Sequence, residues 1–257
     1  MWGVPLDEKR RLATSRRIVM AGSSGPGAGV AAALAADGAR VAVLDPGGDG
    51  RIGAGPESGG LHRVAADFTS AAAVASGVRA AVEVLGGIDQ FVYAWYPEAL
   101  TEPSTFTEVS EAEWARVCEG PLDAAWWLVR ALIGPLRSSG GGSMVFVVPT
   151  VGLTGSSGFV MLSVVAEGLR VLAKGCGRCW GEDGVTVNTL ATSPSLWVAP
   201  DHGARLLREI SLSVPAMGRV GDPGDDLAPM IELLGTSEAH FLTSGTLVTD
   251  GGLWMGL

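Results

Sequence analysis

The chain is poor in residues on which several classes of protein depend. It has 257 residues, with 18 lysines and arginines against 27 aspartates and glutamates, which gives a formal net charge of −9. Nucleic-acid binding needs clustered basic side chains, so this composition argues against nucleic acid as a partner. Only three cysteines are present. This small odd number fits a reducing compartment, and it predicts neither a disulfide framework nor a metal site.

Long hydrophobic runs are also absent. No stretch approaches the ~18 consecutive apolar residues that are typical of a membrane-spanning helix. The N-terminal residues lack an apolar segment followed by a small-residue cleavage site, so a secretory signal is not expected. Together these absences predict a cytoplasmic protein that has no membrane partner.

What the sequence does contain is a regular alternation of strand-like and helix-like segments. We expect strands over 16–22, 40–45, 61–68, 88–95, 143–149, 184–191 and 245–252. We expect helices over 29–39, 70–86, 110–137, 157–180 and 222–235, with a kink in the third of these at Gly120-Pro121. Apolar strands that alternate with helices predict a parallel sheet covered on both faces, hence an α/β fold. Since no linker or repeat interrupts the pattern, one domain is expected over 1–257.

A glycine-rich loop, "AGSSGPGAG" (21–29), follows the first predicted strand and opens the first predicted helix. In this context backbone N–H groups and the helix dipole can bind a phosphate. The candidate nucleotide-binding residues in this loop are Gly22, Ser23, Gly25 and Gly27. The alternative is a tight strand–helix turn that binds no ligand, because glycine motifs of this kind also occur without one.

Two aspartates extend the candidate nucleotide site. Asp45 ends the second predicted strand about 20 residues after the glycine loop, where a carboxylate can bind a ribose diol and repel a 2′-phosphate. Asp45 therefore favours NAD over NADP. Asp67 ends the third predicted strand, near the expected position of an adenine. Either aspartate can instead be a surface turn residue, and we favour that interpretation for Asp67.

Several stretches of the chain carry a family resemblance. They are "SSGPGAGVAAALAADGA" (23–39), "LGGIDQFV" (85–92), "EWARV" (113–117), "GVTVN" (184–188) and "GRVGDPGDDLAPMIELLGTSEAHFLTSGTLVTDGG" (218–252). Over nearly its whole length the chain resembles a short-chain dehydrogenase/reductase of the compact type. The resemblance implies a Rossmann-type, doubly wound sheet of seven parallel strands. It also implies a substrate lid at about 192–221, and a tetramer built from the long helices and the last strand.

The resemblance also implies a catalytic relay of asparagine, serine, tyrosine and lysine. In such a relay the tyrosine transfers a proton, and the lysine lowers the pKa of the phenol from its usual value of ~10. Local alignment places Thr150 at the serine, Ser163 at the tyrosine, Glu167 at the lysine and Pro121 at the asparagine. The usual relay is therefore expected to be missing from this chain.

The resemblance predicts changes in the cofactor site as well. Tyr93-Ala94-Trp95-Tyr96 stands where the family usually has Asn-Asn-Ala-Gly, and Thr192-Ser193 stands where it usually has Pro-Gly. Pro26 lacks a backbone N–H that would face the pyrophosphate. From these changes we expect no cofactor, or only weak binding of NAD(H) through its adenosine half.

Three functions remain open at this point. The favoured one is a non-catalytic subunit that pairs with an active sister enzyme of the same family in a tetramer, since the relay is lost while the closing helix and strand are kept. The second is a repurposed, cofactor-independent enzyme, such as a lyase, isomerase, cyclase or dehalogenase. In it Glu167 would act as acid or base, and Thr150, Ser163 or Tyr96 would hold an oxygen of a small-molecule substrate. The third is an unconventional NAD-dependent oxidoreductase. A homo-tetramer is an alternative to the mixed assembly.

Overall fold

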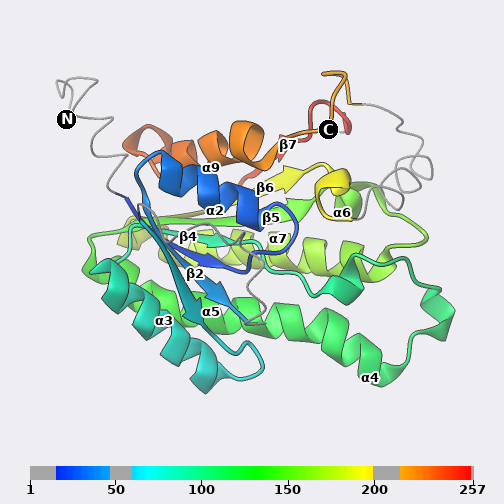
Figure 1. Ribbon diagram of the computed structural model, residues 1–257, viewed down its shortest axis with the longest axis horizontal. Coiled ribbons are helices and arrows are strands. Elements are labelled where there is room, and N and C mark those ends of the chain that lie inside the picture. The colour runs from blue at the N-terminus through cyan, green and yellow to red at the C-terminus, as the bar shows by residue number, and fades with distance from the viewer. Residues whose placement is uncertain (1–15, 47–59, 199–214, 256–257) are drawn as a thin grey trace.

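A computed structural model describes residues 16–46, 60–198 and 215–255. Its centre is a sheet of seven parallel strands in the order β3-β2-β1-β4-β5-β6-β7 (Figure 1). The strands are β1 (Arg17–Ala21), β2 (Arg40–Asp45), β3 (Leu61–Ala65), β4 (Gln90–Tyr93), β5 (Gly142–Pro149), β6 (Val185–Thr192) and β7 (Thr246–Thr249). The predicted doubly wound, seven-stranded parallel sheet is therefore confirmed.

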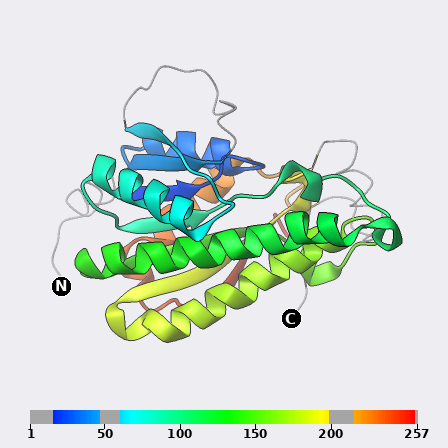
Figure 2. The same ribbon diagram turned by 90° about the horizontal axis from the view of Figure 1, so that it is seen from below.

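Helices cover both faces of the sheet. One face carries α2 (Gly27–Ala36) and α9 (Ala228–Leu234), and the other carries α3 (Ala71–Leu85), α5 (Gly120–Ser138) and α7 (Val160–Trp180). Figure 2 shows α5 and α7 running side by side beneath the sheet. Because both faces are covered, the central strands β1, β4 and β5 are buried along nearly their whole length.

The remaining elements are short. Two are single α-helical turns, α4 (Glu111–Trp114) and α6 (Val151–Thr154). The 3₁₀ turns are η1 (Glu98–Leu100), η2 (Phe106–Glu108), η4 (Gly181–Asp183), η5 (Pro194–Leu196) and η7 (Ser237–Ala239). Two further elements are π-helical turns, η3 (Ala115–Glu119) and η6 (Pro223–Leu227).

The long helix predicted over 110–137 changes its hydrogen-bonding pattern just before Gly120-Pro121. The π-helical turn η3 separates α4 from α5, and Pro121 follows it directly. Proline has no N–H to donate to the carbonyl oxygen four residues earlier, which here belongs to Val117, so the regular α-helical bonding cannot continue through this point. A wider, π-helical turn therefore lies directly before Gly120-Pro121, and the kink predicted there stays a prediction.

The order of the strands positions the candidate site. The chain runs outward from β1 to β3 and then returns to place β4 on the other side of β1, so the loops that follow β1 and β4 lie side by side. The N–H of Ala94 donates to the carbonyl oxygen of Ala21 at 2.9 Å, which joins the start of the segment after β4 to the end of β1. In doubly wound sheets, ligands bind at the carboxyl ends of the strands at such a reversal.

The predicted lid at 192–221 is described only at its two ends, since 199–214 lie outside the described residues.

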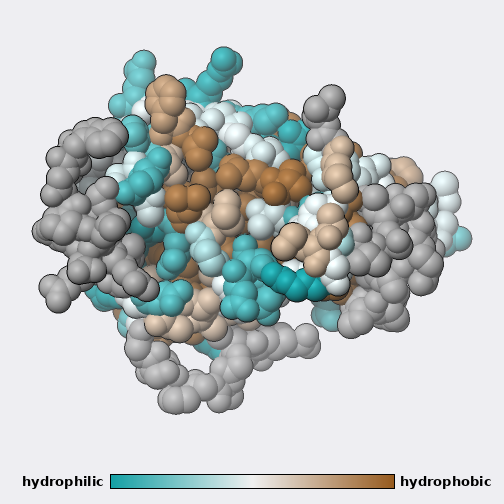
Figure 3. All heavy atoms as spheres, turned by 90° about the horizontal axis from the view of Figure 1, so that it is seen from above, coloured by the Kyte–Doolittle hydropathy of each residue, from teal (hydrophilic) through white to brown (hydrophobic). Residues whose placement is uncertain are grey.

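Seen from the side of α2 and α9, a hydrophobic band crosses the molecule between more hydrophilic areas (Figure 3). Among the described residues, Leu233 in α9 and Val248 in β7 have exposed apolar side chains. Within the described ranges, no helix has the length and apolar character that crossing a membrane requires.

Candidate functional site

The glycine loop between β1 and α2 adopts backbone conformations that require glycine. Gly22 has a φ of +80° and Gly25 a φ of +52°, both in the left-handed region that other residues rarely enter. The N–H of Gly22 donates to the carbonyl oxygen of Leu44 at 2.9 Å, which holds the loop against β2. Gly27 begins α2, and a Cβ there would lie 3.2 Å from the carbonyl oxygen of Gly22. The glycines therefore let the helix, the loop and two strands approach closely.

A cavity of about 560 Å³ opens beside this loop, at the carboxyl ends of the strands; we call it the carboxyl-edge cavity. Its residues come from the loop, from the end of β2, from the segment after β4 and from the segment after β6. They are Ser23, Ser24, Gly25, Ala28, Asp45, Pro46, Trp95, Tyr96, Pro97, Glu98, Thr101 and Trp197. Of the predicted site residues, it brings together Ser23, Gly25, Asp45 and Tyr96.

Asp67 lies outside this cavity. Its carboxylate accepts a hydrogen bond from the backbone N–H of Thr69 at 2.8 Å, just before α3 begins. Hydrogen bonding with Thr69 lowers the pKa of the Asp67 carboxyl. The side chain is exposed. This geometry is that of a surface turn residue, as one of the two interpretations of the sequence anticipated.

The two tyrosines of the chain are turned inward. The hydroxyl of Tyr93 donates to the carbonyl oxygen of Pro121 at 3.0 Å, and that of Tyr96 donates to the carbonyl oxygen of Val147 at 3.3 Å. Burial raises the pKa of both phenols, for Tyr96 well above its usual range. Tyr96 thus borders the carboxyl-edge cavity with its ring, while its proton is used in a bond to the backbone. It is poorly placed to transfer a proton to a substrate.

Two tryptophans cover the glycine loop. A Cβ added to Gly22 would lie 2.5 Å from Cβ of Trp95, and one added to Gly25 would lie 2.7 Å from the indole ring of Trp197. The Trp95 ring is edge-on to Phe68, with 5.0 Å between ring centroids. These close approaches explain why the loop tolerates no side chain at either glycine. The aromatic segment after β4 is therefore part of the wall of the cavity.

Thr150, Ser163 and Glu167 lie together where β5 ends. Thr150 follows β5 and is buried, and its backbone N–H donates to the carbonyl oxygen of Thr192 at 2.8 Å. The hydroxyl of Ser163, in the first turn of α7, donates to the carbonyl oxygen of Phe159 at 3.0 Å. Glu167 follows one turn later on the same helix, so the predicted spacing of the two side chains is confirmed.

The partner of Glu167 is a neighbour on its own helix. Arg170 donates to the carboxylate of Glu167 from Nε at 2.7 Å, and its terminal nitrogen forms a second, shorter bond. Glu167 also packs against α6, because a Cβ on Gly152 would lie 2.9 Å from Oε1 of Glu167. It does not line the carboxyl-edge cavity. The role of Glu167 in the repurposed-enzyme hypothesis stays a prediction, because 199–214, which include most of the expected lid, lie outside the described residues.

Sequence reasoning missed two residues that shape the site. Ser24 accepts a hydrogen bond from the N–H of Tyr96 at 3.0 Å and donates to the carbonyl oxygen of Ala94 at 3.2 Å, so it ties the glycine loop to the segment after β4. Trp197 covers the same loop from the segment after β6. Ser24 stands inside the quoted glycine motif, whereas no local signal marks Trp197.

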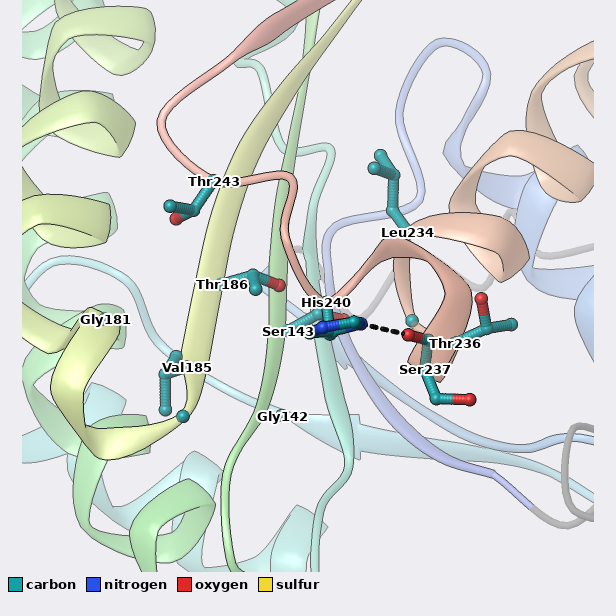
Figure 4. A pocket seen from close by; sticks show the side chains of 12 residues that line it. Gly142, Ser143, Gly181, Val185, Thr186, Leu234, Thr236, Ser237, His240 and Thr243 are labelled. Carbon is teal, nitrogen blue, oxygen red and sulfur yellow. Dashed lines mark hydrogen bonds between the residues drawn. The ribbon is translucent and has the colours of Figure 1, made fainter. Parts of the chain in front are cut away.

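A second cavity, of about 430 Å³, lies at the opposite edge of the sheet, where β5 and β6 begin. Figure 4 shows its residues, including Ser143 and Thr186 from these strands and His240 after η7. The dashed line marks the contact of Nδ1 of His240 with the carbonyl oxygen of Ser237 at 2.5 Å. None of the predicted site residues lines this cavity. Among the residues that the structure describes, no group of three or more His, Cys, Asp or Glu side chains is arranged to hold a metal ion.

The chain is similar to known enzymes over almost its whole length. It is 28% identical to 2,5-dichloro-2,5-cyclohexadiene-1,4-diol dehydrogenase LinX of Sphingobium indicum, over 96% of this chain and 99% of the relative. It is 28% identical to 2-dehydro-3-deoxy-L-rhamnonate dehydrogenase (NAD(+)) of a Sphingomonas species, over 91% and 93% of the two chains. The crystal structure of a dehydrogenase/reductase from Sinorhizobium meliloti 1021 superposes with a TM-score of 0.81 at 24% identity, and the alignment covers 96% of this chain and all of that chain.

These relatives correct two predictions. The prediction of a non-catalytic subunit is wrong, because the relatives are named as active enzymes, among them an acetoacetyl-CoA reductase and a 3-oxoacyl-[acyl-carrier-protein] reductase. The prediction of no cofactor, or only weak NAD(H) binding, is wrong for the same reason, since one relative is named for NAD(+) itself. Both predictions gave too much weight to single motif positions. The changes at Pro26 and in the segment after β4 leave a cavity at the carboxyl edge, with Asp45 in its wall.

The match to a family model supports the same conclusion. Residues 20–254 fit the model described as enoyl-(acyl carrier protein) reductase. This range runs from the end of β1 to beyond β7, so it includes strands β2 to β7, the glycine loop and the residues around Thr150. The chain is therefore a member of the short-chain dehydrogenase/reductase family.

Proposed function

We propose that this chain is an oxidoreductase that uses NAD to interconvert a small secondary alcohol and the corresponding ketone. The observation that carries the proposal is the position of Asp45 in the wall of the carboxyl-edge cavity, together with Ser23 and Gly25 of the glycine loop. The names of the relatives support the reaction class, since they act on a cyclic diol, on hydroxysteroids and on a dehydro-deoxy sugar acid.

The residues on this side of the cavity fit the adenosine half of a dinucleotide. The carboxylate of Asp45 stands at the end of β2, where it can accept hydrogen bonds from both hydroxyls of a ribose and would repel a 2′-phosphate. Gly25 and the N-terminal end of α2, which begins at Gly27, are suited to the pyrophosphate, because the positive end of the helix dipole attracts an anion. NAD is thus preferred to NADP.

The nicotinamide ring of the dinucleotide would accept or supply the hydride. The residues of the chain supply binding, orientation and the exclusion of water. Trp95 and Tyr96 form an apolar wall that keeps water away from bound ligand. Thr150, at the end of β5, is the residue that we assign to hold the substrate oxygen, because the hydroxyl proton of Ser163 already bonds to a backbone carbonyl oxygen.

Proton transfer is expected to be the slow step of the proposed reaction. A serine or threonine hydroxyl is a weak acid at neutral pH, and the phenol of Tyr96 is bonded to the backbone. A positioned acid or base usually contributes about 10²–10⁴-fold to a rate. We therefore expect slow turnover compared with family members that carry tyrosine and lysine in the relay.

Titration of the purified chain with NADH, followed by tryptophan fluorescence and by calorimetry, tests the proposal. Trp95 and Trp197 both line the cavity, so bound dinucleotide is expected to change the emission, with one site per chain and a weaker response to NADPH. Absence of binding at millimolar NADH and NADPH would refute the proposal. Oxidation of a panel of cyclic and acyclic secondary alcohols, measured as NADH formation, then tests the reaction.

We also propose that the chain forms a homo-tetramer. Leu233 in α9 and Val248 in β7 have exposed apolar side chains, and exposed apolar surface often marks an interface. Light scattering after size-exclusion chromatography is expected to give four times the mass of one 26.3 kDa chain. Val248→Glu is expected to shift the protein towards smaller species, and a monomeric wild-type chain would contradict the proposal.

A further inference from the structure

We propose that Trp197 closes the carboxyl-edge cavity over the glycine loop, and that the dinucleotide binds by displacing this indole. The inference rests on the proposed function, because it concerns how the same cavity admits its cofactor. In this proposal Trp197, which lies outside the quoted family motifs, sets the affinity for the dinucleotide. Three observations carry it: the contact of Trp197 with Gly25, the bonds that hold the indole, and the position of Asp45.

The first observation is the closeness of Trp197 to Gly25. A Cβ placed on Gly25 would lie 2.7 Å from Cε3, 3.2 Å from Cζ3 and 3.3 Å from Cδ2 of the Trp197 indole. The six-membered part of the ring therefore fills the space directly above the α-carbon of Gly25. Glycine is needed in dinucleotide-binding loops because the pyrophosphate approaches the backbone closely. A pyrophosphate cannot fit between Gly25 and an indole at this distance.

The second observation is how the indole is held. Nε1 of Trp197 donates to Oγ1 of Thr192 at 2.8 Å, and the ring is edge-on to Tyr96 with 4.5 Å between centroids. The residue is only 4% exposed. A side-chain hydrogen bond, an aromatic contact, the packing on Gly25 and burial in the hydrophobic core hold this position, and none of these belongs to the hydrogen-bonded ladder of the sheet. The indole can therefore leave without breaking the strands that form the site.

Thr192 stabilises this position of the indole through its hydroxyl. It is the last residue of β6, and its hydroxyl contacts both the indole and the carbonyl oxygen of Val148, at 3.4 Å. A hydroxyl can accept from the indole N–H and donate to a carbonyl oxygen at the same time. Removing the Thr192 hydroxyl thus weakens the closed position and leaves the indole itself in place.

The third observation is that the adenosine side of the cavity stays accessible. Asp45, Pro46 and Ala28 line the cavity together with Trp197, so the cavity is present while the indole covers Gly25. The adenosine half can therefore bind first, and the pyrophosphate then needs the space of the indole. A ligand that binds only the open form has an apparent dissociation constant equal to its intrinsic value divided by the fraction of open molecules. If about one molecule in ten is open, removing the indole tightens binding about tenfold.

The experiment compares Trp197→Ala and Thr192→Val with the wild-type chain and with Trp126→Ala. Trp126 is a suitable control because it is 47% exposed on α5 and does not line the cavity. NADH binding is measured by calorimetry, which does not depend on the fluorescence of the mutated residue. Trp197→Ala is expected to bind at least tenfold more tightly than the wild type, Thr192→Val to fall between them, and Trp126→Ala to match the wild type.

Stopped-flow mixing provides a second readout. If the indole must move before binding is complete, the observed rate for the wild type levels off as the NADH concentration rises. The same rate for Trp197→Ala is expected to rise linearly over the same range. Circular dichroism and thermal melting of each variant check that it is folded, and Thr192→Val remains informative if Trp197→Ala is not.

The outcomes separate the two proposals. Suppose that the wild type binds NADH, that Trp197→Ala has the same or a lower affinity, and that Thr192→Val has no higher affinity. This result would overturn the displacement of Trp197 but not the proposed function. Absence of NADH binding by the wild type would instead overturn the proposed function. If Trp197→Ala and Thr192→Val both bind NADH at least severalfold more tightly than the wild type does, both proposals are supported.

Discussion

The hydroxyl of Tyr96 donates its hydrogen bond to the carbonyl oxygen of Val147, at 3.3 Å, and so faces the interior of the sheet. Burial raises the pKa of this phenol well above its usual range. The phenol therefore stays neutral throughout the pH range in which the protein is handled. The aromatic segment after β4 is a structural wall of the cavity, and the hydroxyl of Tyr96 stabilises the fold.

A first prediction follows for Tyr96→Phe. Activity and its pH profile are expected to be unchanged, because the phenol neither ionises nor contacts substrate. Unfolding in urea is expected to show a loss of about 1 kcal/mol, the usual net worth of one buried hydrogen bond. A large fall in the turnover number together with a shifted pH profile would instead show that Tyr96 transfers the proton.

A second prediction concerns the choice of dinucleotide. Asp45→Ala is expected to weaken NADH binding roughly 10- to 100-fold, the loss expected when hydrogen bonds to a charged group, worth about 1.5–3 kcal/mol, are removed. Binding of NADPH is expected to weaken less, because the repulsion of its 2′-phosphate disappears. Calorimetry with both dinucleotides measures the ratio. Asp67→Ala is the matched control, because Asp67 lies outside the cavity, and it is expected to leave both affinities unchanged.

A third prediction tests the assignment of Thr150. Thr150→Val removes the hydroxyl with little change in shape and is expected to lower the turnover number about 10²–10³-fold, as for other donors that hold a reacting oxygen. The affinity for NADH is expected to stay the same. Thr150→Ser restores a hydroxyl and is expected to recover most of the rate. An unchanged turnover number in Thr150→Val would show that another residue holds the substrate oxygen, and Ser163→Ala would then be the next test.

Much of the fold was predictable because its signals are local. Strands such as β1 and β5 are buried apolar runs that contain β-branched residues, and Pro121, which has no N–H, directly follows a π-helical turn. Strand β4 ends earlier than predicted, at Tyr93, because the next residues leave the sheet to bond with the loop after β1. The sequence pattern alone could not show that bond, which joins segments about 70 residues apart.

The candidate site was predictable only in part. Asp45 and the glycine loop follow strands whose carboxyl ends meet at one edge, so their proximity follows from the fold. The partner of Glu167 was not anticipated, although Arg170 stands only three residues away, because several partners compete for a surface carboxylate. The cover that Trp197 places over Gly25 depends on side-chain packing across 172 residues of chain, and no periodicity or motif encodes it.

A fourth prediction concerns stability in acid. Arg219 binds the carboxylate of Asp226 through two nitrogens, at 2.5 and 2.6 Å, and this lowers the pKa of Asp226 to about 2. A carboxyl with a lowered pKa stabilises the folded state above its unfolded value of ~3.9, and the contribution disappears as the pH falls towards the folded value. The melting temperature of Asp226→Asn is therefore expected to lie below that of the wild type at pH 5–7 and to meet it near pH 2. The difference is expected to be small, because solvent screens exposed ion pairs. A gap that widens as the pH falls would contradict this account.

A fifth prediction separates backbone strain from the contact with the indole. Gly25 and Gly86 both have positive φ, +52° and +71°, but a Cβ on Gly86 would meet nothing within 4 Å. Gly86→Ala is therefore expected to cost only the penalty of the left-handed conformation, about 1–2 kcal/mol in the free energy of unfolding. Gly25→Ala carries the same penalty and also forces the Trp197 ring to move, which adds about 1–3 kcal/mol, as overpacking usually does.

The decisive comparison places Gly25→Ala in the background of Trp197→Ala. Without the indole the added methyl group has free space, so the cost of Gly25→Ala is expected to fall to that of Gly86→Ala, in a double-mutant cycle measured by urea unfolding. A cost of Gly25→Ala that is equal in the two backgrounds would mean that Trp197 does not rest on Gly25 in solution. The cycle needs no dinucleotide, so it tests the closed position of the indole independently of the proposed function.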